Sequence, residues 1–369
     1  MKKFCSRFVG LLFASLWLLA AAAMLLPARA WSQNENRFLS QMPDLSGQAV
    51  QSGSFQEGMS TYLSDQIPFR SGWIRAYTAV RKLMGSREIN GIYLGEDHRY
   101  FQKFTDDSYS SGRMLGVLRM METFLQQQKI PARVMLVPSP GTILRNKLPE
   151  HAPYYDPEPV YAAAGQLLSS PVIDLRKAFS ESGRDLYYHT DHHWTTEGAQ
   201  IAYEAYAEAA GLEPHPARLQ PVSRTFRGTL DSRVLDLAAR DDTVEALLQL
   251  PPVRITFEDG TTADTPYVSA KLQEKDQYGF FFGGNYGKVT MDTGAESGRR
   301  LLIFKDSFAN CFVPFLFEDY SSIVMLDLRY FDGSVAEVIR EQGTDEILFL
   351  YETSNFLTDN GILKLGKEF

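Results

Sequence analysis

Residues 187–194, Tyr-Tyr-His-Thr-Asp-His-His-Trp, are the part of the chain best suited to chemistry, with three of its six histidines beside a carboxylate and a tryptophan. If this segment is extended, as its tyrosines and threonine favour, alternate side chains share a face. Asp191 and His193 then project together while His192 points away. An imidazole held in one tautomer by a carboxylate is the general-base half of a hydroxyl-activating triad, which needs a nucleophile from elsewhere in the chain.

A serine that directly follows a buried strand and precedes a helix would be exposed at the edge of a sheet. The sequence Leu-Leu-Ile-Phe-Lys-Asp-Ser-Phe-Ala-Asn at residues 301–310 places Ser307 at such a corner. Free backbone N–H groups and the helix dipole there can stabilise an oxyanion. Asp306 or Ser307 could instead simply cap the helix. The separate pair of Asp191 and His193 favours Ser307 as the nucleophile.

Four further residues are candidates for contact with an oxyanion or a substrate. Gly284 or Asn285, in a glycine-rich run, could bring a backbone N–H close to the oxyanion, and an ordinary turn is the alternative interpretation of that run. Trp194 could stack on a sugar ring or pack in the core. Arg329 follows a predicted parallel strand at its carboxyl end, where it could contact substrate or form an ion pair with Asp327.

A metal site is the second interpretation of the histidine-rich segment. His189, Asp191 and His193 fall on one face of an extended chain, and two imidazoles with a carboxylate form a plausible ligand set for a divalent metal. The outer two would be about 13 Å apart on a flat strand, so all three reach one ion only if the chain bends. The triad interpretation requires no metal and no cofactor.

Residues 1–30 have the features of an export signal. Three basic residues precede an uncharged apolar run at residues 8–26, and Ala-Arg-Ala ends at residue 30. The run exceeds the usual signal core of about 7–15 residues and approaches the roughly 20 that span a bilayer, so either cleavage or a retained membrane anchor is possible. In both cases the rest of the chain is predicted to be extracytoplasmic.

Charge and cysteine content narrow the class of protein further. A net charge of −8, an isoelectric point near 5.4 and no basic run after the first residues argue against nucleic-acid binding. The aromatic content of 12% is compatible with a carbohydrate-facing cleft, although aromatic residues also fill cores. Cys5 lies in the export segment and Cys311 is the other cysteine, so the exported part has no intrachain disulfide.

The apolar periodicity predicts an N-terminal lead-in at residues 31–105 that packs on a main domain at 106–369. The lead-in has a helix ending at the tract 65–70, a second helix at 72–84 and short paired strands at 89–101. The main domain alternates predicted helices at 111–127, 159–168, 195–210, 308–317 and 335–342 with strands at 133–137, 171–175, 301–304, 321–326 and 346–351. An irregular insertion at 213–298 has possible antiparallel strands at 253–257, 279–282 and 288–291. The fold class is α/β, with a mostly parallel sheet covered on both faces.

The motif Asp191-His192-His193-Trp194 resembles the signature of the DHHW protein family of Gram-positive bacteria. Other segments resemble further blocks of that family, namely residues 35–37, 65–70, 275–278, 283–287 and 305–310. More distantly, the pattern at residues 190–194 is similar to that of the extracytoplasmic alginate O-acetyltransferase proteins, whose domain is SGNH-hydrolase-like. Two departures from many SGNH enzymes are Lys305 in place of glycine before Asp306 and Ser307, and a spacing of two between Asp191 and His193.

The resemblance implies an SGNH-hydrolase-like three-layer fold with Asp191, His193 and Ser307 as a triad. It also implies transfer of acyl groups to a cell-surface or secreted polysaccharide and a membrane-bound O-acyltransferase partner that delivers the acyl group. We therefore predict an extracytoplasmic O-acyltransferase, most simply an O-acetyltransferase, that forms an acyl-enzyme. The alternatives are a polysaccharide O-acetyl esterase and a non-catalytic, membrane-tethered glycan-binding or scaffold protein.

Overall fold

The computed structural model describes residues 2–25 and 27–367, which divide into two compact units. The first unit comprises Met1–Asn90 with Asp231–Ala239, and the second comprises Gly91–Leu230 with Arg240–Phe369. Every residue of the predicted triad belongs to the second unit.

The first unit is mainly helical. Its elements are α1 (Lys2–Leu25), β1 (Trp31–Ser32), β2 (Arg37–Phe38), α2 (Gly47–Ser52), α3 (Ser54–Gln66), α4 (Arg70–Leu83) and β3 (Glu88–Ile89). Two residues of the predicted export segment, 1 and 26, lie outside the described residues. Within the described ranges, no helix has the length and apolar character needed to cross a membrane.

Helix α3 ends where the sequence predicts, because Ile67, which precedes Pro68, has ψ 132° and leaves the helical region. The tract that follows is held by a charge network. Arg37 binds both oxygens of Asp65, at 2.9 and 2.6 Å, and Arg70 binds both oxygens of Glu35, at 2.8 and 3.1 Å. Two of the blocks that resemble the DHHW family are therefore joined to each other by ion pairs.

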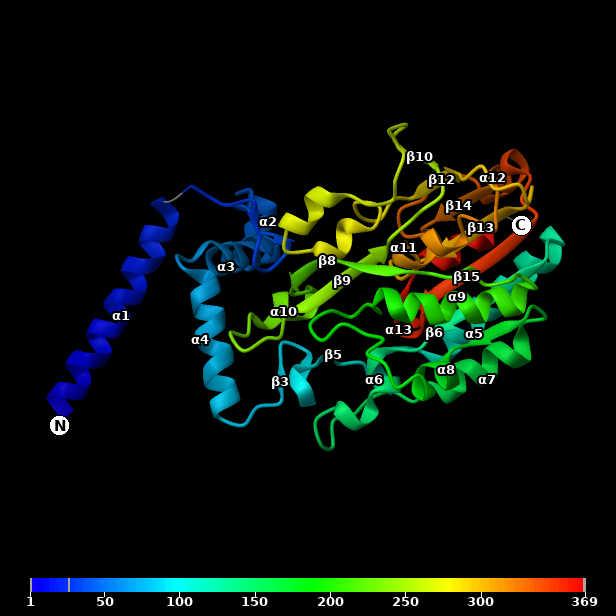
Figure 1. Ribbon diagram of the computed structural model, residues 1–369. Coiled ribbons are helices and arrows are strands. Elements are labelled where there is room, and N and C mark those ends of the chain that lie inside the picture. Colours follow the sequence, from blue (N-terminus) through cyan, green and yellow to red (C-terminus); the bar gives the residue numbers. More distant parts are fainter. Residues whose placement is uncertain (1, 26, 368–369) are drawn as a thin grey trace. The chain divides into compact units, whose positions relative to one another are not determined.

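The second unit is built on an eight-stranded sheet with the order β11-β10-β12-β14-β13-β15-β6-β7 (Figure 1). The five strands from β14 to β7 are parallel, and β12, β10 and β11 extend the sheet in antiparallel fashion. These strands are β6 (Ala132–Val137), β7 (Val172–Asp174), β10 (Arg254–Phe257), β11 (Thr262–Ala263), β12 (Lys288–Asp292), β13 (Arg300–Lys305), β14 (Ser322–Leu326) and β15 (Glu346–Glu352). Two smaller hairpins pair β4 (Ile92–Leu94) with β5 (Tyr100–Gln102) and β8 (Leu219–Phe226) with β9 (Asp242–Leu247).

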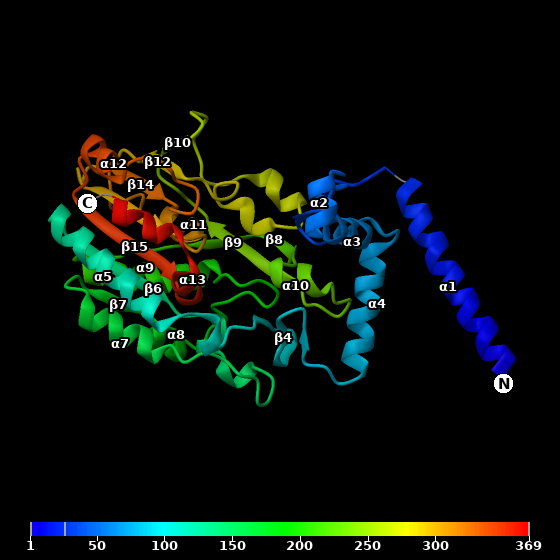
Figure 2. The ribbon, with the colours of Figure 1, turned by 180° about the vertical axis from the view of Figure 1, so that it is seen from behind.

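Alternation along the central strands creates a separate core on each face of the sheet. In β13, Leu301 and Ile303 join the core covered by α9 (Thr196–Ala210) and α11 (Ala309–Phe312), while Leu302 and Phe304 join the opposite core. That second core is covered by α5 (Ser111–Gln128), α7 (Glu158–Leu167), α12 (Val335–Gln342) and α13 (Thr353–Thr358). Figure 1 looks onto the α9 side and Figure 2 onto the α5 side. The unit is thus a three-layer α/β fold.

The remaining helices of this unit are short. They are α6 (Pro140–Ile143), α8 (Arg176–Glu181) and α10 (Thr229–Val234), which begins in this unit and continues into the other. Each buried aliphatic side chain of the central strands contributes about 1.5–3 kcal/mol relative to exposure, which explains why the apolar runs form the centre of the sheet.

The predicted helices and strands of the regular part are present within one or two residues at their ends, except that helix 308–317 divides into α11 and a 3-10 turn, Val313–Leu316. In the irregular insertion, the predicted strands at 253–257 and 288–291 are β10 and β12. The predicted strand at 279–282 is wrong, because Gln277–Phe280 form a 3-10 turn and, among the described residues, this segment pairs only through the isolated bridge from Tyr267 to Phe281. The last two residues of the predicted main domain, 368 and 369, lie outside the described residues.

Candidate active site

The histidine-rich segment is a closed loop, so the condition of an extended chain, on which the argument from alternating faces depended, is not met. A single antiparallel bridge joins Tyr187 to Trp194, and the Tyr188 N–H donates to the His193 carbonyl at 3.2 Å. Within the loop, the His193 N–H donates to Asp191 Oδ1 at 2.9 Å. This local side-chain turn, and not strand alternation, brings Asp191 and His193 together. It also corrects the placement of His192, whose ring lies 3.9 Å from the His193 ring, centroid to centroid.

The turn after β13 is anchored by Asp306. Its carboxylate accepts hydrogen bonds from the Phe308 N–H at 2.9 Å, the Glu352 N–H at 2.8 Å and the Asn355 Nδ2 at 2.8 Å. These bonds tie the turn to the carboxyl end of the neighbouring strand β15. Asp306 thus closes a turn ahead of α11, whose N-cap is Phe308 and has no side-chain cap bond, so the capping alternative is wrong for both Asp306 and Ser307. The hydroxyl of Ser307 is left for another partner.

The structure brings Ser307, His193 and Asp191 into one hydrogen-bonded chain. His193 Nε2 lies 2.6 Å from Ser307 Oγ, and His193 Nδ1 lies 2.6 Å from Asp191 Oδ1. A carboxylate can only accept, so Nδ1 carries the proton and Nε2 is free to accept the serine hydroxyl proton. Asp191 is fully buried, while His193 and Ser307 are 5% and 8% exposed.

The outer oxygen of Asp191 is held by the start of α10. Asp191 Oδ2 accepts from the Thr229 N–H at 2.7 Å and from the Thr229 hydroxyl at 2.9 Å. Burial alone raises the pKa of Asp191, but the imidazoles of His192 and His193 and these hydrogen bonds hold the pKa well below its usual range. The Asp191 carboxylate is therefore ionised in the folded protein near neutral pH.

A tyrosine that the sequence reasoning did not single out covers the imidazole of His193. The ring of Tyr278 stacks on His193 with centroids 3.7 Å apart and an interplanar angle of 7°. Its hydroxyl donates to the Ser307 carbonyl at 3.1 Å, so the same residue fixes both the ring and the serine backbone. Tyr278 lies in the block 275–278 that resembles the DHHW family, and this resemblance could have identified it as a site residue. No feature of the sequence pointed to Thr229.

The backbone N–H of Ser307 donates to no acceptor among the described residues, which suits it to an oxyanion. The helix-dipole part of our expectation is weak, because α11 is a single turn. Gly284 and Asn285 lie beside residues that flank the serine: Asn310 Nδ2 donates to the Gly284 carbonyl at 3.3 Å, and Lys305 Nζ donates to Asn285 Oδ1 at 2.9 Å. No hydrogen bond links either of them to Ser307 in the described part of the chain, and their contact with an oxyanion stays a prediction.

Trp194 and Arg329 have structural partners. Trp194 is fully buried, its Nε1 donates to the Phe308 carbonyl at 3.0 Å, and its ring packs near Phe312. Stacking of Trp194 on a sugar is therefore wrong, and the core alternative holds. Arg329 makes a two-point ion pair with Asp327, at 2.8 and 2.6 Å, which is the alternative that the sequence left open.

His189, one of the three predicted metal ligands, is engaged by other residues. His189 Nδ1 pairs with Asp242 at 2.8 Å and its Nε2 pairs with Arg240 at 3.0 Å. Among the described residues, possible ligand atoms of Asp191, His192 and His193 do lie within 4.8 Å of one another. Both ring nitrogens of His193 are already hydrogen-bonded in the triad, so an ion bound through His193 would have to displace Asp191 or Ser307.

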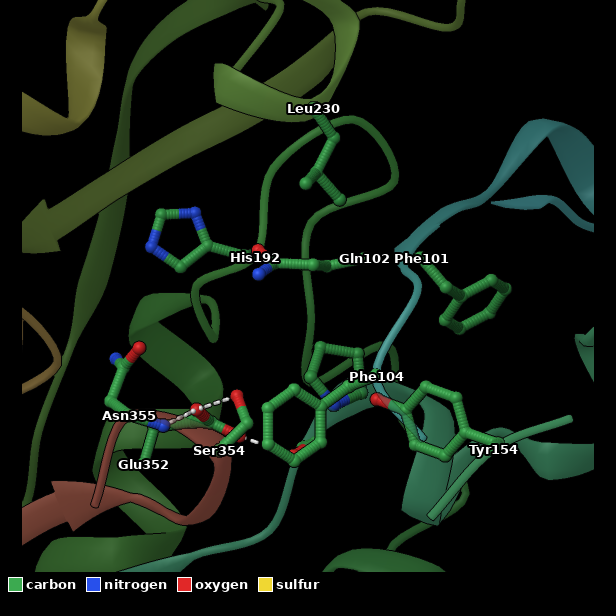
Figure 3. A pocket seen from close by; sticks show the side chains of 11 residues that line it. Phe101, Gln102, Phe104, Tyr154, His192, Leu230, Glu352, Ser354 and Asn355 are labelled. Atoms are coloured by element: carbon green, nitrogen blue, oxygen red, sulfur yellow. Dashed lines mark hydrogen bonds between the residues drawn. The ribbon is translucent and has the colours of Figure 1, made fainter. Parts of the chain in front are cut away.

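A small hollow of about 20 Å³ lies beside this centre (Figure 3). Figure 3 shows Phe101 and Tyr154 on one side of it and His192 and Asn355 on the other. At its floor, Glu352 accepts from Ser354 Oγ at 2.5 Å and from the Asn355 N–H at 2.9 Å, and it also accepts from Ser139 Oγ. Burial raises the pKa of Glu352. This polar floor was not found from the sequence, because Ser139 lies 213 positions before Glu352 in the chain.

Comparison with known proteins places this arrangement in context. Residues 97–275 match the family described as SGNH hydrolase-like domain, acetyltransferase AlgX. The fold is SGNH hydrolase-like. A curated relative, the probable alginate O-acetylase AlgJ of Pseudomonas fluorescens, is 22% identical over 216 residues, or 55% of this chain. The chain spans about half the length of that relative, 52%.

Solved structures of related proteins have the same fold. A DHHW family protein from Eubacterium siraeum superposes with a TM-score of 0.62 at 22% identity, covering 75% of this chain and 96% of that one. Bacillus cereus PatB1, determined with a sulfonyl adduct, superposes with a TM-score of 0.61 at 22% identity, covering 74% and 97%. The resemblance to DHHW proteins and to alginate O-acetyltransferase proteins, stated from the sequence, is confirmed.

Proposed function

We propose that this protein is a serine-dependent O-acyltransferase, most simply an O-acetyltransferase, that acylates a polysaccharide outside the cytoplasm. The observation that carries the proposal is the continuous chain from Ser307 Oγ through His193 to Asp191, with 2.6 Å at each step. The matched domain family is an acetyltransferase family and the curated relative is a probable alginate O-acetylase, which favours acyl transfer to a glycan over other serine chemistry.

The geometry supports a two-step reaction. Ser307 Oγ attacks the carbonyl carbon of an acyl donor while His193 Nε2 takes its proton, and the leaving group departs with that proton. An acceptor hydroxyl then attacks the acyl-enzyme, its proton passes to His193, and Ser307 Oγ recovers a proton as its bond to the acyl carbon breaks. Asp191 keeps Nδ1 protonated throughout and stabilises the imidazolium. The stacked face of Tyr278 adds to that stabilisation.

The remaining parts of the proposal come from the sequence and the resemblance. A membrane-bound O-acyltransferase would supply the acyl group, and a cell-surface or secreted polysaccharide would receive it. The apolar segment at residues 8–26 would direct the protein out of the cytoplasm and either hold it at the membrane or be cleaved.

The test uses an activated ester, p-nitrophenyl acetate, and intact-protein mass measurement. We expect a burst of p-nitrophenol and one acetyl group on Ser307, and a sulfonyl fluoride should block both, since a sulfonyl adduct of B. cereus PatB1 is known. Ser307→Ala should lower turnover by about 10³-fold or more. The matched control is Ser321→Ala, whose hydroxyl donates to the Arg299 carbonyl at the opposite end of the parallel strands.

Unchanged turnover in Ser307→Ala would remove the proposal. Rapid release of acetate to water, with no transfer to glycans, would show that the protein is an esterase and not a transferase. Glycan binding without turnover of any ester would favour the alternative of a non-catalytic glycan-binding or scaffold protein. Loss of activity on chelation with recovery on zinc addition would revive the metal interpretation.

A further inference from the structure

His192 has one ring nitrogen whose role is fixed by its neighbours. Its Nδ1 lies 2.8 Å from Thr229 Oγ1, and that hydroxyl lies 2.9 Å from Asp191 Oδ2. A carboxylate accepts and cannot donate, so the single proton of Thr229 Oγ1 points to Asp191. The Thr229 oxygen must then accept from His192, which places the His192 proton on Nδ1. Its Nε2 therefore carries a lone pair.

That lone pair has no donor in the described part of the chain. The hydrogen bond to Thr229 is made by Nδ1, and none reaches His192 Nε2. The side chain of His192 is 30% exposed, so a solute can reach it. Burial of the ring and the neighbouring His193 lower the pKa of His192, which keeps it neutral and keeps Nε2 an acceptor near neutral pH.

The unpaired nitrogen belongs to a ring that lies directly beside the catalytic imidazole. The rings of His192 and His193 are 3.9 Å apart, and His193 Nε2 is hydrogen-bonded to Ser307 Oγ. His192 also lines the small hollow with Gln102, Leu230 and Asn355 (Figure 3). A space of about 20 Å³ admits a group of the size of a water molecule or a hydroxyl and excludes a sugar ring.

We propose that His192 Nε2 accepts a hydrogen bond from the hydroxyl next to the one being acylated, so that the acceptor is recognised as a vicinal diol. This inference rests on the proposed function and names its acceptor chemistry. The attacking hydroxyl gives its proton to His193, while the neighbouring hydroxyl keeps its own and donates it to His192. No proton is transferred to His192, which acts as an acceptor-binding residue. A simple alcohol fills the first position and leaves His192 without a donor.

The experiment measures competition for one acyl-enzyme, formed by the full-length protein with p-nitrophenyl acetate. 1,2-Cyclohexanediol and cyclohexanol compete as acceptors, and the ratio of their acetylated products is read by mass spectrometry. This ratio does not depend on how fast the acyl-enzyme forms. We expect the wild-type protein to prefer the diol by about five- to tenfold, the effect of one hydrogen bond.

Two substitutions separate the two ring nitrogens. His192→Asn keeps a donor near the position of Nδ1 for Thr229 but removes the acceptor at Nε2, so the preference for the diol should disappear. His192→Gln places a side-chain oxygen near the position of Nε2 and should recover part of the preference. His151→Asn is the matched control, because the His151 side chain is 91% exposed and its positive φ of 60° is tolerated by asparagine.

The outcomes are distinct from those for the proposed function. If Ser307 acquires no acetyl group in the wild-type protein, the acyl-transfer proposal fails. If Ser307 is acetylated but the wild-type protein shows no preference for the diol, or His192→Asn keeps that preference, the acceptor role of His192 is overturned. A loss of preference equal in His192→Asn and His151→Asn would overturn it as well.

Discussion

Both oxygens of Asp191 are engaged, one by the His193 ring and backbone and the other by Thr229. This arrangement dictates which nitrogen of His193 carries the proton, because an acceptor-only group faces Nδ1. Tyr278 restricts the ring from its face, so the imidazole can neither tilt nor exchange tautomers without breaking several contacts. At the scale of single residues, the site is organised to keep His193 Nε2 unprotonated and aimed at Ser307.

Asp191→Asn tests this arrangement. An amide that turns its NH₂ toward Nδ1 favours the tautomer protonated at Nε2, which cannot accept the serine proton. We expect kcat for p-nitrophenyl acetate to fall by about 10³- to 10⁴-fold with the fold retained. Asp241→Asn is the control, since the Asp241 side chain is 48% exposed and pairs with Arg227. A loss of less than tenfold in Asp191→Asn would contradict the assigned tautomer.

At the scale of elements, the histidine-rich loop depends on close packing with the segment that leads into α10. The Gly228 backbone passes so near Asp191 that a Cβ at position 228 would lie 2.3 Å from both Asp191 Cβ and Oδ2. The glycine is required here by space and not by backbone conformation, because Gly228 is not among the residues with positive φ. The start of α10 can therefore reach the outer oxygen of Asp191.

Gly228→Ala should move the carboxylate and lower kcat by about 10²-fold, the cost of a misplacement near 1 Å. Overpacking should also lower stability by about 1–3 kcal/mol. Gly165→Ala is the matched control, because an added Cβ in the middle of α7 meets nothing within 4 Å and should stabilise the helix by about 0.5–1 kcal/mol. Turnover and thermal melting of both variants test this prediction. Normal turnover in Gly228→Ala would show that the position of Asp191 does not depend on the absence of a side chain at residue 228.

The elements also show where sequence reasoning succeeds and where it ends. Strands β13 and β15 could be predicted because they are buried on both faces and read as continuous apolar runs. The loop 187–194 could not, because the argument from alternating faces assumes a paired strand and this segment has one bridge. The hairpin of β8 and β9 was missed because β8 is largely exposed and its register shifts after Pro221. Thr229 reaches Asp191 across 38 positions of sequence, which no local pattern encodes.

At the scale of the whole molecule, the division into two units separates the triad from the charge network of the N-terminal part. The second unit contains Ser307, His193 and Asp191, and the first unit contains Glu35, Arg37 and Asp65. The bidentate pair of Arg37 and Asp65 is also joined by the Ser40 N–H, which donates to Asp65 Oδ2 at 2.9 Å. Among the described residues, the first unit has few buried apolar side chains, so such a network carries a larger share of its stability.

Asp65→Asn should therefore destabilise the first unit by about 2 kcal/mol, because it leaves Arg37 without its charged acceptor. The hydrogen bond from Arg37 lowers the pKa of Asp65 to about 2. Since folding lowers this pKa below the usual value of about 3.9, the ionised carboxylate contributes its full stability above about pH 4 and loses it as the pH falls through 2. Hydrogen exchange of α3 should show faster opening in Asp65→Asn at neutral pH and no difference from the wild-type protein at the acid limit.

Turnover of p-nitrophenyl acetate by Asp65→Asn should stay at the wild-type level. The control is Glu57→Gln, a substitution at an exposed position of the same helix. A parallel loss of ester turnover in Asp65→Asn would show that the catalytic centre depends on the integrity of the N-terminal unit.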